Sequence, residues 1–502
     1  MIRLALAALL ALAAPALAQG DKQGSTPPRG AQAAPADSSA PQQVTIGGAA
    51  LDLVAEVSTL PIRTADGKAQ GEVTATSFTL TGADPRTRPV VFAVNGGPGA
   101  SSAWLDLGAA GPWRLDFSGP ISPGRSPALA DNQESWLPFA DLVFLDPPGT
   151  GWARVLGDDD ARKRLWSVEG DLAALASAIR QWLEAHGRLV SPKVVAGESY
   201  GGFRGPRLVA ALREQQGVGV AGLLLVSPVL DFGERAATND PWPWMTHLPS
   251  FAAIARGAAS RGAILDAEAY AAGDYLLDFT RGEGDDAAIA RMSEHVAALA
   301  GLDPALVREH AGRVRSRTFL QERGLQERGR AMGVRGSLYD GLVTALDPYP
   351  AGNGEGGFDP LLDALRAPFA SAAMALYRDR LHWTPEGTYQ LLNDRVARGW
   401  DYQHDRDPQS TDALREDLAL DPALRVAVAH GLYDLVTPYF ASKLLLDQVP
   451  ARIAAGRLRL LVAPGGHMLY SREASRAALR DLARWVALGD PPAGEAEAGA
   501  PR

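Results

Sequence analysis

The residues best suited to chemistry form the pentapeptide Gly-Glu-Ser-Tyr-Gly at residues 197–201. It matches the G-x-S-x-G pattern, in which a serine lies on a sharp turn between a strand and a helix. An apolar run at residues 193–196 leads into the motif, and a helix-like segment at residues 203–212 follows it. The flanking glycines permit a tight turn and close approach of neighbouring main chain. Ser199 is therefore a candidate nucleophile; a glycine-rich turn without chemistry is the alternative.

A serine hydroxyl is a weak nucleophile until a base takes its proton. His467 follows an apolar run that ends at Val462, and Asp434 follows another that ends at Ala429. If both runs are parallel strands, all three side chains lie at the same sheet edge, and the order serine, acid, histidine is that of α/β-hydrolases. We predict Ser199, Asp434 and His467 as nucleophile, orienting acid and base. Taken singly, such an aspartate is often a turn residue and a lone histidine often a structural one.

A third chemical feature is the segment Asn-Gly-Gly-Pro-Gly-Ala-Ser-Ser at residues 95–102, directly after an apolar run at residues 89–94. Acyl transfer needs main-chain N–H groups aimed at the developing oxyanion. One such group comes from the residue after the nucleophile, here Tyr200, and another from a glycine-rich loop after an early strand. Residues 95–102 fit the second role; a plain Gly-Pro turn is the alternative.

Short apolar runs recur along the chain with helical segments between them. Such runs are typical of strands buried on both faces of a sheet. The runs are residues 89–94, 142–145, 193–196, 223–226, 426–429 and 458–462. Helical spacing of apolar residues appears at residues 168–183 and again at 479–486. This alternation predicts an α/β protein with a mostly parallel central sheet and helices on both faces.

The alternation breaks between residues 240 and 420, which we interpret as a helical insertion, or cap, lying over the sheet. The core is then built from two blocks, residues 46–239 and 421–490, that come together in space. Residues 19–45 and 491–502 are rich in Ala, Pro and Gly and bury too little apolar surface to offset their ordering entropy. We therefore predict a disordered linker and a disordered tail.

Composition excludes several classes of function. The chain of 502 residues has a formal net charge of -9, so it lacks the basic footprint of a nucleic-acid-binding protein. It contains no cysteine, which excludes disulfides, thiolate nucleophiles and cysteine-based metal sites. The histidines are scattered and no H-E-x-x-H motif occurs, so we expect no metal. Serine acyl chemistry needs no cofactor, and the sequence does not indicate an oligomeric state.

The first 18 residues are typical of a secretory signal peptide. Arg3 gives the positive start, residues 4–17 are apolar apart from a break at Pro15, and a small-x-small cleavage site ends at Ala18. An ordinary N-terminal helix is the alternative. The run is too short to cross a bilayer about 30 Å thick, and no later stretch is long enough. We expect no membrane span and a mature protein that is periplasmic or secreted.

Four blocks of sequence, in order, resemble those of the serine carboxypeptidases, and the chain is similar to an exported bacterial member. They are residues 95–102, Asp-Pro-Pro-Gly-Thr-Gly-Trp at 146–152, Gly-Glu-Ser-Tyr-Gly-Gly at 197–202, and Gly-Leu-Tyr-Asp at 431–434 with Gly-Gly-His-Met at 465–468. The resemblance covers the core from about residue 46 to 490 and is weak over the insertion. It implies the α/β-hydrolase fold and a serine peptidase, a carboxypeptidase acting through an acyl-enzyme.

The resemblance also implies roles for residues around the nucleophile. Gly97 and Tyr200 would supply the oxyanion N–H groups, and Asn95, Gly96 and Glu198 would hold the C-terminal carboxylate of a peptide.

The chain departs from the family in its acid pair. The family pairs the glutamate at position 198 with a second glutamate, which favours activity at acid pH because one of two such carboxyls must stay protonated. The matching position here is Ala109. Two alternatives therefore stay open: an esterase or acyltransferase with the same triad, which Ala109 favours, and a non-catalytic exported binding protein, which the complete triad and oxyanion loop disfavour.

Overall fold

A computed structural model describes residues 34–490, with short gaps. The gaps are residues 117–121, 125–127, 233–238, 329–332, 349–357, 403–407 and 455. The predicted signal peptide at 1–18, the predicted tail at 491–502 and most of the predicted linker lie outside the described residues.

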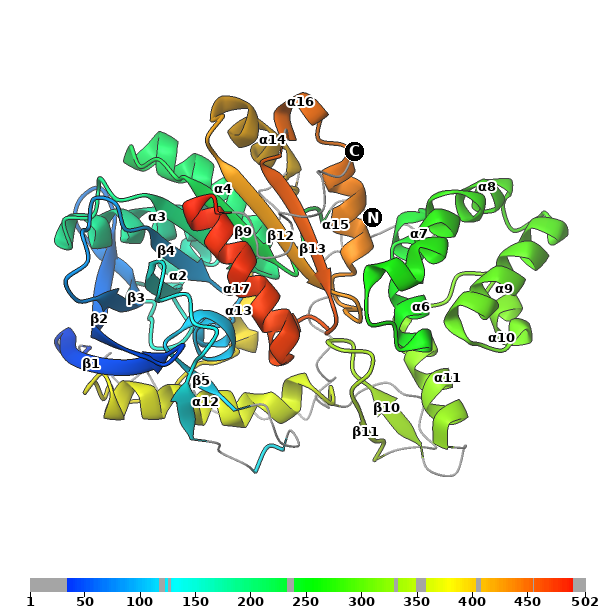
Figure 1. The fold of residues 1–502 in the computed structure, drawn as a ribbon, viewed down its shortest axis with the longest axis horizontal. Helices are drawn as coiled ribbons and strands as arrows, with labels where there is room; N and C mark the ends of the chain where they lie inside the picture. The colour runs from blue at the N-terminus through cyan, green and yellow to red at the C-terminus, as the bar shows by residue number, and fades with distance from the viewer. Residues whose placement is uncertain are drawn as a thin grey trace.

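Nine strands form one sheet that runs through the centre of the molecule (Figure 1). Their spatial order is β1 (Ser38–Ile46), β2 (Ala49–Arg63), β3 (Ala69–Leu80), β7 (Asp141–Asp146), β4 (Val90–Val94), β8 (Lys193–Glu198), β9 (Gly222–Val226), β12 (Arg425–Gly431) and β13 (Leu458–Ala463). The strands from β7 to β13 in this order run parallel, whereas β1, β2 and β3 pair antiparallel at one edge. All of the runs predicted as strands are strands of this sheet, so the mostly parallel α/β architecture is confirmed.

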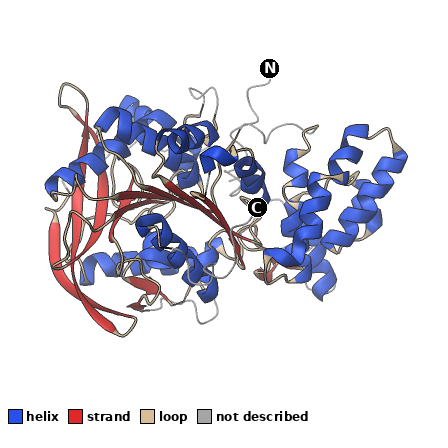
Figure 2. Cartoon of the chain, turned by 45° about the horizontal axis from the view of Figure 1, so that its top comes forward, coloured by secondary structure: helices blue, strands red, loops and turns tan. Residues whose placement is uncertain are grey.

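Helices cover both faces of the sheet (Figure 2). Successive side chains of each strand point to opposite faces of the sheet. In β4, Phe92 packs into one core, whereas Val91 and Ala93 pack into the other. The first core is closed by α3 (Val168–Ala185), α4 (Tyr200–Gln216) and α14 (Thr411–Leu420), and the second by α12 (Leu362–Asp379) and α17 (Glu473–Leu488). This burial on both faces explains why the central strands have continuous apolar sequences.

The linker prediction is wrong for residues 38–45, which form most of β1 and pair in register with β2. Ala40, Val44 and Ile46 point into the core, with 5%, 1% and 7% of their surfaces exposed. An edge strand with one buried face needs only every second residue to be apolar. The intervening Pro and Gln residues therefore gave this strand the composition of a linker.

Residues 242–328 form a helical lobe beside the sheet, at the right of Figure 1. Its apolar core includes the stacked rings of Phe251 and Phe319 and continues into Tyr439 and Phe440 of α15 (Tyr439–Asp447). The lobe consists of α5 (Trp242–Met245), α6 (Leu248–Arg256), α7 (Leu265–Ala272), α8 (Asp274–Arg281), α9 (Asp286–Ala300), α10 (Pro304–Glu309) and α11 (Ser316–Arg328).

The rest of the predicted insertion has a different position. A short hairpin, β10 (Val334–Gly336) with β11 (Thr344–Leu346), follows the lobe. Helices α12 and α14 then return to the two faces of the sheet, so residues 240–420 divide into a lobe and a covering layer. Among the described helices, none is long and apolar enough to cross a membrane.

Candidate active site

Ser199 lies on the turn between β8 and α4, as the sequence predicts. Its backbone has φ 61° and ψ −119°, a conformation that is strained for any residue except glycine. Main-chain hydrogen bonds hold it there: its N–H donates to the carbonyl of Val226 at 2.9 Å, and its carbonyl accepts from Gly202 at 2.8 Å and Val229 at 3.2 Å. The turn therefore fixes the serine above the carboxyl end of the sheet.

The glycines around Ser199 are needed for close approach of main chain. A Cβ atom on Gly197 would lie 2.0 Å from the carbonyl oxygen of Gly201, across the turn itself. A Cβ atom on Gly96 would lie 2.4 Å from the nitrogen of Tyr200. The loop after β4 thus packs directly against the turn that carries Ser199.

Asp434 and His467 come together from the loops that follow β12 and β13. Nδ1 of His467 lies 2.9 Å from Oδ2 of Asp434, and 4% and 0% of the two residues is exposed. The other carboxylate oxygen of Asp434 accepts from the N–H groups of Val436 at 2.8 Å and Thr437 at 3.0 Å. This arrangement leaves Nε2 of His467 as the nitrogen that can act as a base.

The two groups stabilise each other's charged forms. Burial alone would raise the pKa of Asp434, but the charge of His467 and the hydrogen bonds from His467 and Thr437 hold that pKa below its usual value. Burial alone would lower the pKa of His467, but the charge and hydrogen bond of Asp434 raise it above its usual value. Asp434 is thus the anion that orients the imidazole and favours its protonated form.

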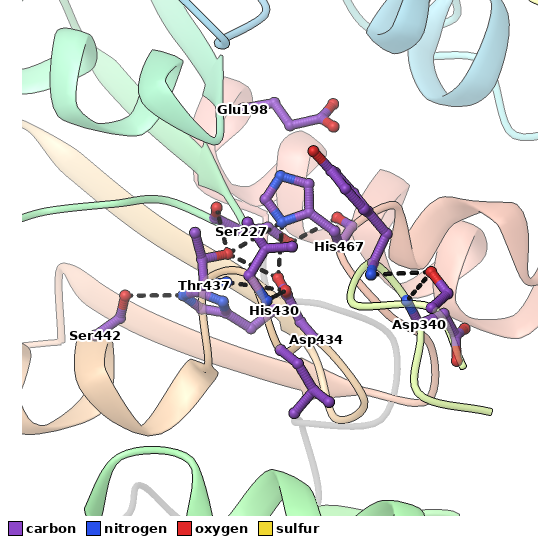
Figure 3. A network of polar contacts seen from close by, with 12 residues as sticks. Glu198, Ser227, Asp340, His430, Asp434, Thr437, Ser442 and His467 are labelled. Atoms are coloured by element: carbon purple, nitrogen blue, oxygen red, sulfur yellow. Dashed lines mark hydrogen bonds and ion pairs between the residues drawn. The ribbon is translucent and has the colours of Figure 1, made fainter. Parts of the chain in front are cut away.

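Two further residues of this network are absent from the sequence-based prediction. The hydroxyl of Thr437 lies 2.7 Å from Oδ2 of Asp434 and 3.1 Å from Nδ1 of His467. Ser227, directly after β9, donates from its hydroxyl to the carbonyl of His467 at 2.7 Å. Figure 3 shows this network below the imidazole, with Glu198 on the opposite side of the ring from Asp434. The only sequence signal for Thr437 is its place three residues after an aspartate, which is typical of a turn.

Glu198 is a buried carboxyl group directly before Ser199 in the chain, with 3% of its surface exposed. Its Oε2 accepts from the amide of Asn95 at 3.0 Å, and the hydroxyl of Tyr470 lies 2.9 Å from Oε2 and 3.1 Å from Oε1. Burial raises the pKa of Glu198 to about 7, although the charge of His467 and these two hydrogen bonds oppose the rise. The predicted residues Asn95 and Glu198 therefore lie in direct contact, and Tyr470 is a partner that the sequence did not reveal.

Asn95 is fixed in one orientation by its other contacts. Its Oδ1 accepts from the N–H of Leu105 at 3.0 Å, which leaves its amide nitrogen facing Glu198. Its carbonyl accepts from Arg204 at 2.7 Å, and Arg204 is in turn held by the buried Asp171 at 2.6 Å. A buried ion pair on α3 and α4 thus supports the loop next to Ser199.

The predicted oxyanion donors are Gly97 and Tyr200. Tyr200 is the first residue of α4, so its N–H is one of the groups that have no carbonyl partner within the helix. Gly97 has φ 102°, in the region that favours glycine, and the preceding Gly96 lies against the nitrogen of Tyr200. The two predicted donors therefore lie on adjacent segments beside Ser199.

The segment between β10 and β11 forms one wall beside the histidine. The carbonyl of Tyr339 accepts from the N–H of His467 at 2.6 Å, and its ring meets the imidazole edge-on at 5.3 Å. Leu338 and Gly341 bond to the main chain around Asp434 through Leu435 and Tyr433. Part of the predicted insertion thus reaches the site itself.

Residues 77–250 match the family model for serine carboxypeptidases. Among curated proteins, the chain is 29% identical over 153 residues to serine carboxypeptidase-like 13 of Arabidopsis thaliana, covering 30% of this chain and 34% of that protein. It is 31% identical over 121 residues to the pheromone-processing carboxypeptidase KEX1 of Saccharomyces cerevisiae, covering 23% of this chain and 16% of that protein. The chain thus matches about a third of the length of the plant relative.

Among solved structures, a proline iminopeptidase of Mycobacterium smegmatis aligns with 86% of this chain and 99% of its own, at 15% identity and a TM-score of 0.37.

The family match contains the segments that carry Ser199 and Asn95, but it ends before Asp434 and His467. The pairing of Asp434 with His467 therefore rests on the geometry of this structure.

Proposed function

We propose that this chain is an exported serine peptidase, a serine-type carboxypeptidase with Ser199, His467 and Asp434 as its triad. The observation that carries the proposal is the buried contact of 2.9 Å between Asp434 and His467 at the sheet edge where Ser199 lies on its strained turn. The match of residues 77–250 to serine carboxypeptidases supports the same reaction class.

In this mechanism Oγ of Ser199 attacks the scissile carbonyl carbon while Nε2 of His467 takes the hydroxyl proton. Asp434 keeps the other nitrogen of His467 protonated and stabilises the imidazolium that forms. The N–H groups of Gly97 and Tyr200 would bind the oxyanion of the tetrahedral intermediate. The intermediate collapses when His467 protonates the leaving amine, and a water molecule, activated by the same histidine, then hydrolyses the acyl-enzyme.

The specificity for a chain end would come from Asn95, Gly96 and Glu198. A neutral carboxylic acid can donate a hydrogen bond to a carboxylate, whereas an ionised one repels it. Glu198 has a pKa of about 7 because of its burial, so it would be a donor in acid and near-neutral solution. The substrate class is therefore a peptide with a free C-terminal carboxylate.

An esterase or acyltransferase is the second candidate function. The observation in its favour is Ala109, a buried residue without a carboxyl group where serine carboxypeptidases have their second glutamate. The same triad would form the acyl-enzyme in either case, and the difference would lie in the group that is bound or that accepts the acyl chain.

The test compares two blocked peptides, one with a free C-terminal carboxylate and one amidated, from pH 4 to 8. Stepwise loss of residues from the free acid alone is the result expected of a carboxypeptidase. Equal cleavage of both peptides, or turnover of esters alone, would move the second candidate to first place.

The triad assignment has its own control in Ser199→Ala. We expect this variant to fold like the parent protein and to lose both turnover and labelling by a serine-directed fluorophosphonate. Persistent turnover in a clean preparation of the variant would contradict the assignment. A parent protein that binds peptides but is not labelled would indicate a non-catalytic binding protein.

Export is a separate part of the proposal and depends on residues 1–18, whose sequence has the features of a signal peptide. The expected mature protein begins after Ala18 and is periplasmic or secreted. N-terminal sequencing of the protein from cell fractions tests this.

A further inference from the structure

The chemistry around Glu198 is unusual because the described partners of this buried carboxyl are hydrogen-bond donors rather than a second acid. Its hydrogen bonds run to the amide of Asn95 and the hydroxyl of Tyr470. The charged groups that face it are His467, from the loop after β13, and Asp434, from the loop after β12. Glu198 is thus held by fixed neutral donors, while the charges of His467 and Asp434 shift its pKa in opposite directions.

The side chain of Tyr470 is fixed in one position by its surroundings. It is fully buried, and its ring packs on Gly108, where a Cβ atom would lie 2.5 Å from Cε2 of the ring. Its main-chain carbonyl accepts from Arg476 of α17 at 2.6 Å. It also lies on the short 3₁₀ turn Leu469–Ser471, three residues after His467, so the loop that places the histidine also places this hydroxyl.

The direction of each hydrogen bond follows from the surroundings. Burial raises the pKa of Tyr470 well above its usual value. The hydroxyl therefore stays protonated and donates a hydrogen bond to Glu198. The amide nitrogen of Asn95 faces the same carboxyl because its oxygen is engaged by Leu105. When Glu198 is protonated, its own proton is therefore left for an acceptor outside this set of donors.

We propose that Tyr470 is a positioning residue for Glu198, and that its hydroxyl orients this carboxyl group to receive the free C-terminal carboxylate of a peptide. It does so from beside Gly108 and Ala109, the segment in which the chain lacks a second acid. The inference rests on the proposed carboxypeptidase function and adds to it the residue on which recognition of the chain end depends.

The hydroxyl has two opposing effects that an experiment can separate. It orients Glu198, so its loss weakens binding of the carboxylate at low pH. It also stabilises the ionised form of Glu198, so its loss raises the pKa of Glu198 and delays the repulsion that begins when this group ionises. A residue that only supported the fold would lower the activity on every substrate and at every pH.

The experiment measures kcat and KM of the full-length mature Tyr470→Phe variant on the free-acid and amidated peptides from pH 5 to 8. We expect KM for the free acid at pH 5 to rise roughly tenfold, with kcat and the activity on a small ester unchanged. The pH at which that KM begins to climb should move upward. Tyr275→Phe, which removes a buried hydroxyl in the helical lobe, is the matched control and should show neither effect.

Glu198→Gln tests the partner of this hydroxyl. Its amide can still donate but cannot ionise, so KM for the free acid should become independent of pH, and adding Tyr470→Phe should no longer move the pH profile. Equal losses on acid, amide and ester substrates in Tyr470→Phe, or no change in any of them, would overturn the inference.

A second readout separates this inference from the proposed function. Infrared difference titration follows the carboxyl band that Glu198→Gln removes, and Tyr470→Phe should shift its midpoint to higher pH. A parent protein without preference for the free acid contradicts the carboxypeptidase proposal and the recognition role together. A preference for the free acid with an unmoved carboxyl midpoint overturns the role of Tyr470 alone.

Discussion

Thr437 holds the buried contact between Asp434 and His467, although it is not a member of the predicted triad. Its hydroxyl lies between Oδ2 of Asp434 at 2.7 Å and the carbonyl of Ser227 at 3.0 Å, and its main-chain N–H binds the other oxygen of the same carboxylate. Thr437 thus fixes the carboxylate of Asp434 and links it to Ser227, the residue directly after β9. The orientation of His467 therefore depends on Asp434 and, through Asp434, on Thr437.

We expect Thr437→Val to lower kcat by roughly tenfold, because one hydrogen bond to a charged group is lost and the main-chain bonds remain. KM should change little, since Thr437 does not reach the substrate site. Thr246→Val removes a similar buried hydroxyl in the helical lobe and should leave kcat unchanged. Steady-state kinetics on one peptide tests both variants; an unchanged kcat in Thr437→Val would show that the carboxylate is held by the main chain alone.

The acid itself has two separable effects, on the tautomer of His467 and on its pKa. Asp434→Asn should reduce kcat by about ten-thousand-fold, because the amide favours the wrong tautomer. Asp434 raises the pKa of His467 by stabilising the imidazolium, so its loss should move the acid limb of the kcat/KM profile to lower pH. The residual activity of the variant, followed from pH 4 to 8, tests the sign; a limb that moves to higher pH would contradict the assignment of this pair.

At the scale of elements, β1 is the outermost strand of the antiparallel part of the sheet. It covers one edge of β2 and buries Ala40, Val44 and Ile46. Removing residues 1–48 should therefore lower the free energy of unfolding by at least about 3 kcal/mol, the value of burying two branched apolar side chains.

Removing only residues 1–33 is the matched control for that deletion, because it keeps β1 and the hydrogen bonds of Ala36 with Trp383 and of Asp37 with Thr59. Thermal unfolding of the two truncated proteins should show a clear fall for the longer deletion and little change for the shorter one. Equal stability of both proteins would mean that β1 contributes nothing to the folded core.

The sequence predicted the strands with continuous apolar runs and the helices with regular apolar spacing, and it missed strands that have no such run. All parallel strands were found because each contains an apolar run, and α3 was found from its helical spacing. By contrast, β3 is almost completely buried but is built largely from Ala, Thr, Ser and Gly, so it has no apolar run. Burial without strong hydrophobicity leaves no local signal.

The same limit applies to the site. The placement of Ser199, Asp434 and His467 at one sheet edge was predictable because each follows a strand, and parallel strands bring their carboxyl ends to one edge. Thr437 and Tyr470 were not, because their importance comes from contacts with residues that are distant in sequence. A side chain that acts on another side chain can be identified only when the fold has placed the two together.

At the scale of the whole molecule, burial of acidic groups makes stability depend on pH. Asp146, at the end of β7, is buried, and burial raises its pKa to about 7 although Ser102 donates to it at 2.7 Å. It lines a small cavity with Asp106, whose pKa is also raised by burial and then by the charge of Asp146. Ser102, at the end of the segment that begins with Asn95, lines the same cavity.

Asp146 has a higher pKa in the folded chain than its usual value of 3.8. Its stabilising contribution is therefore complete below about pH 4 and is lost as the pH rises through 7, by up to about 4 kcal/mol. Asp146→Asn removes this ionisation, so its stability should fall less between pH 5 and pH 8 than that of the parent protein. Denaturant unfolding at both pH values tests this, and an equal fall in both proteins would show that folding does not raise the pKa of Asp146.

The central sheet is finished by β13, and His467 follows that strand near the end of the described chain. During synthesis the nucleophile on its turn is made first, the helical lobe second, and the base last. A chain that stops early, or that loses its final strand, therefore has Ser199 but nothing to take its proton. Under the proposed mechanism, incomplete copies of this protein would have no hydrolytic activity until the last strand has joined the sheet.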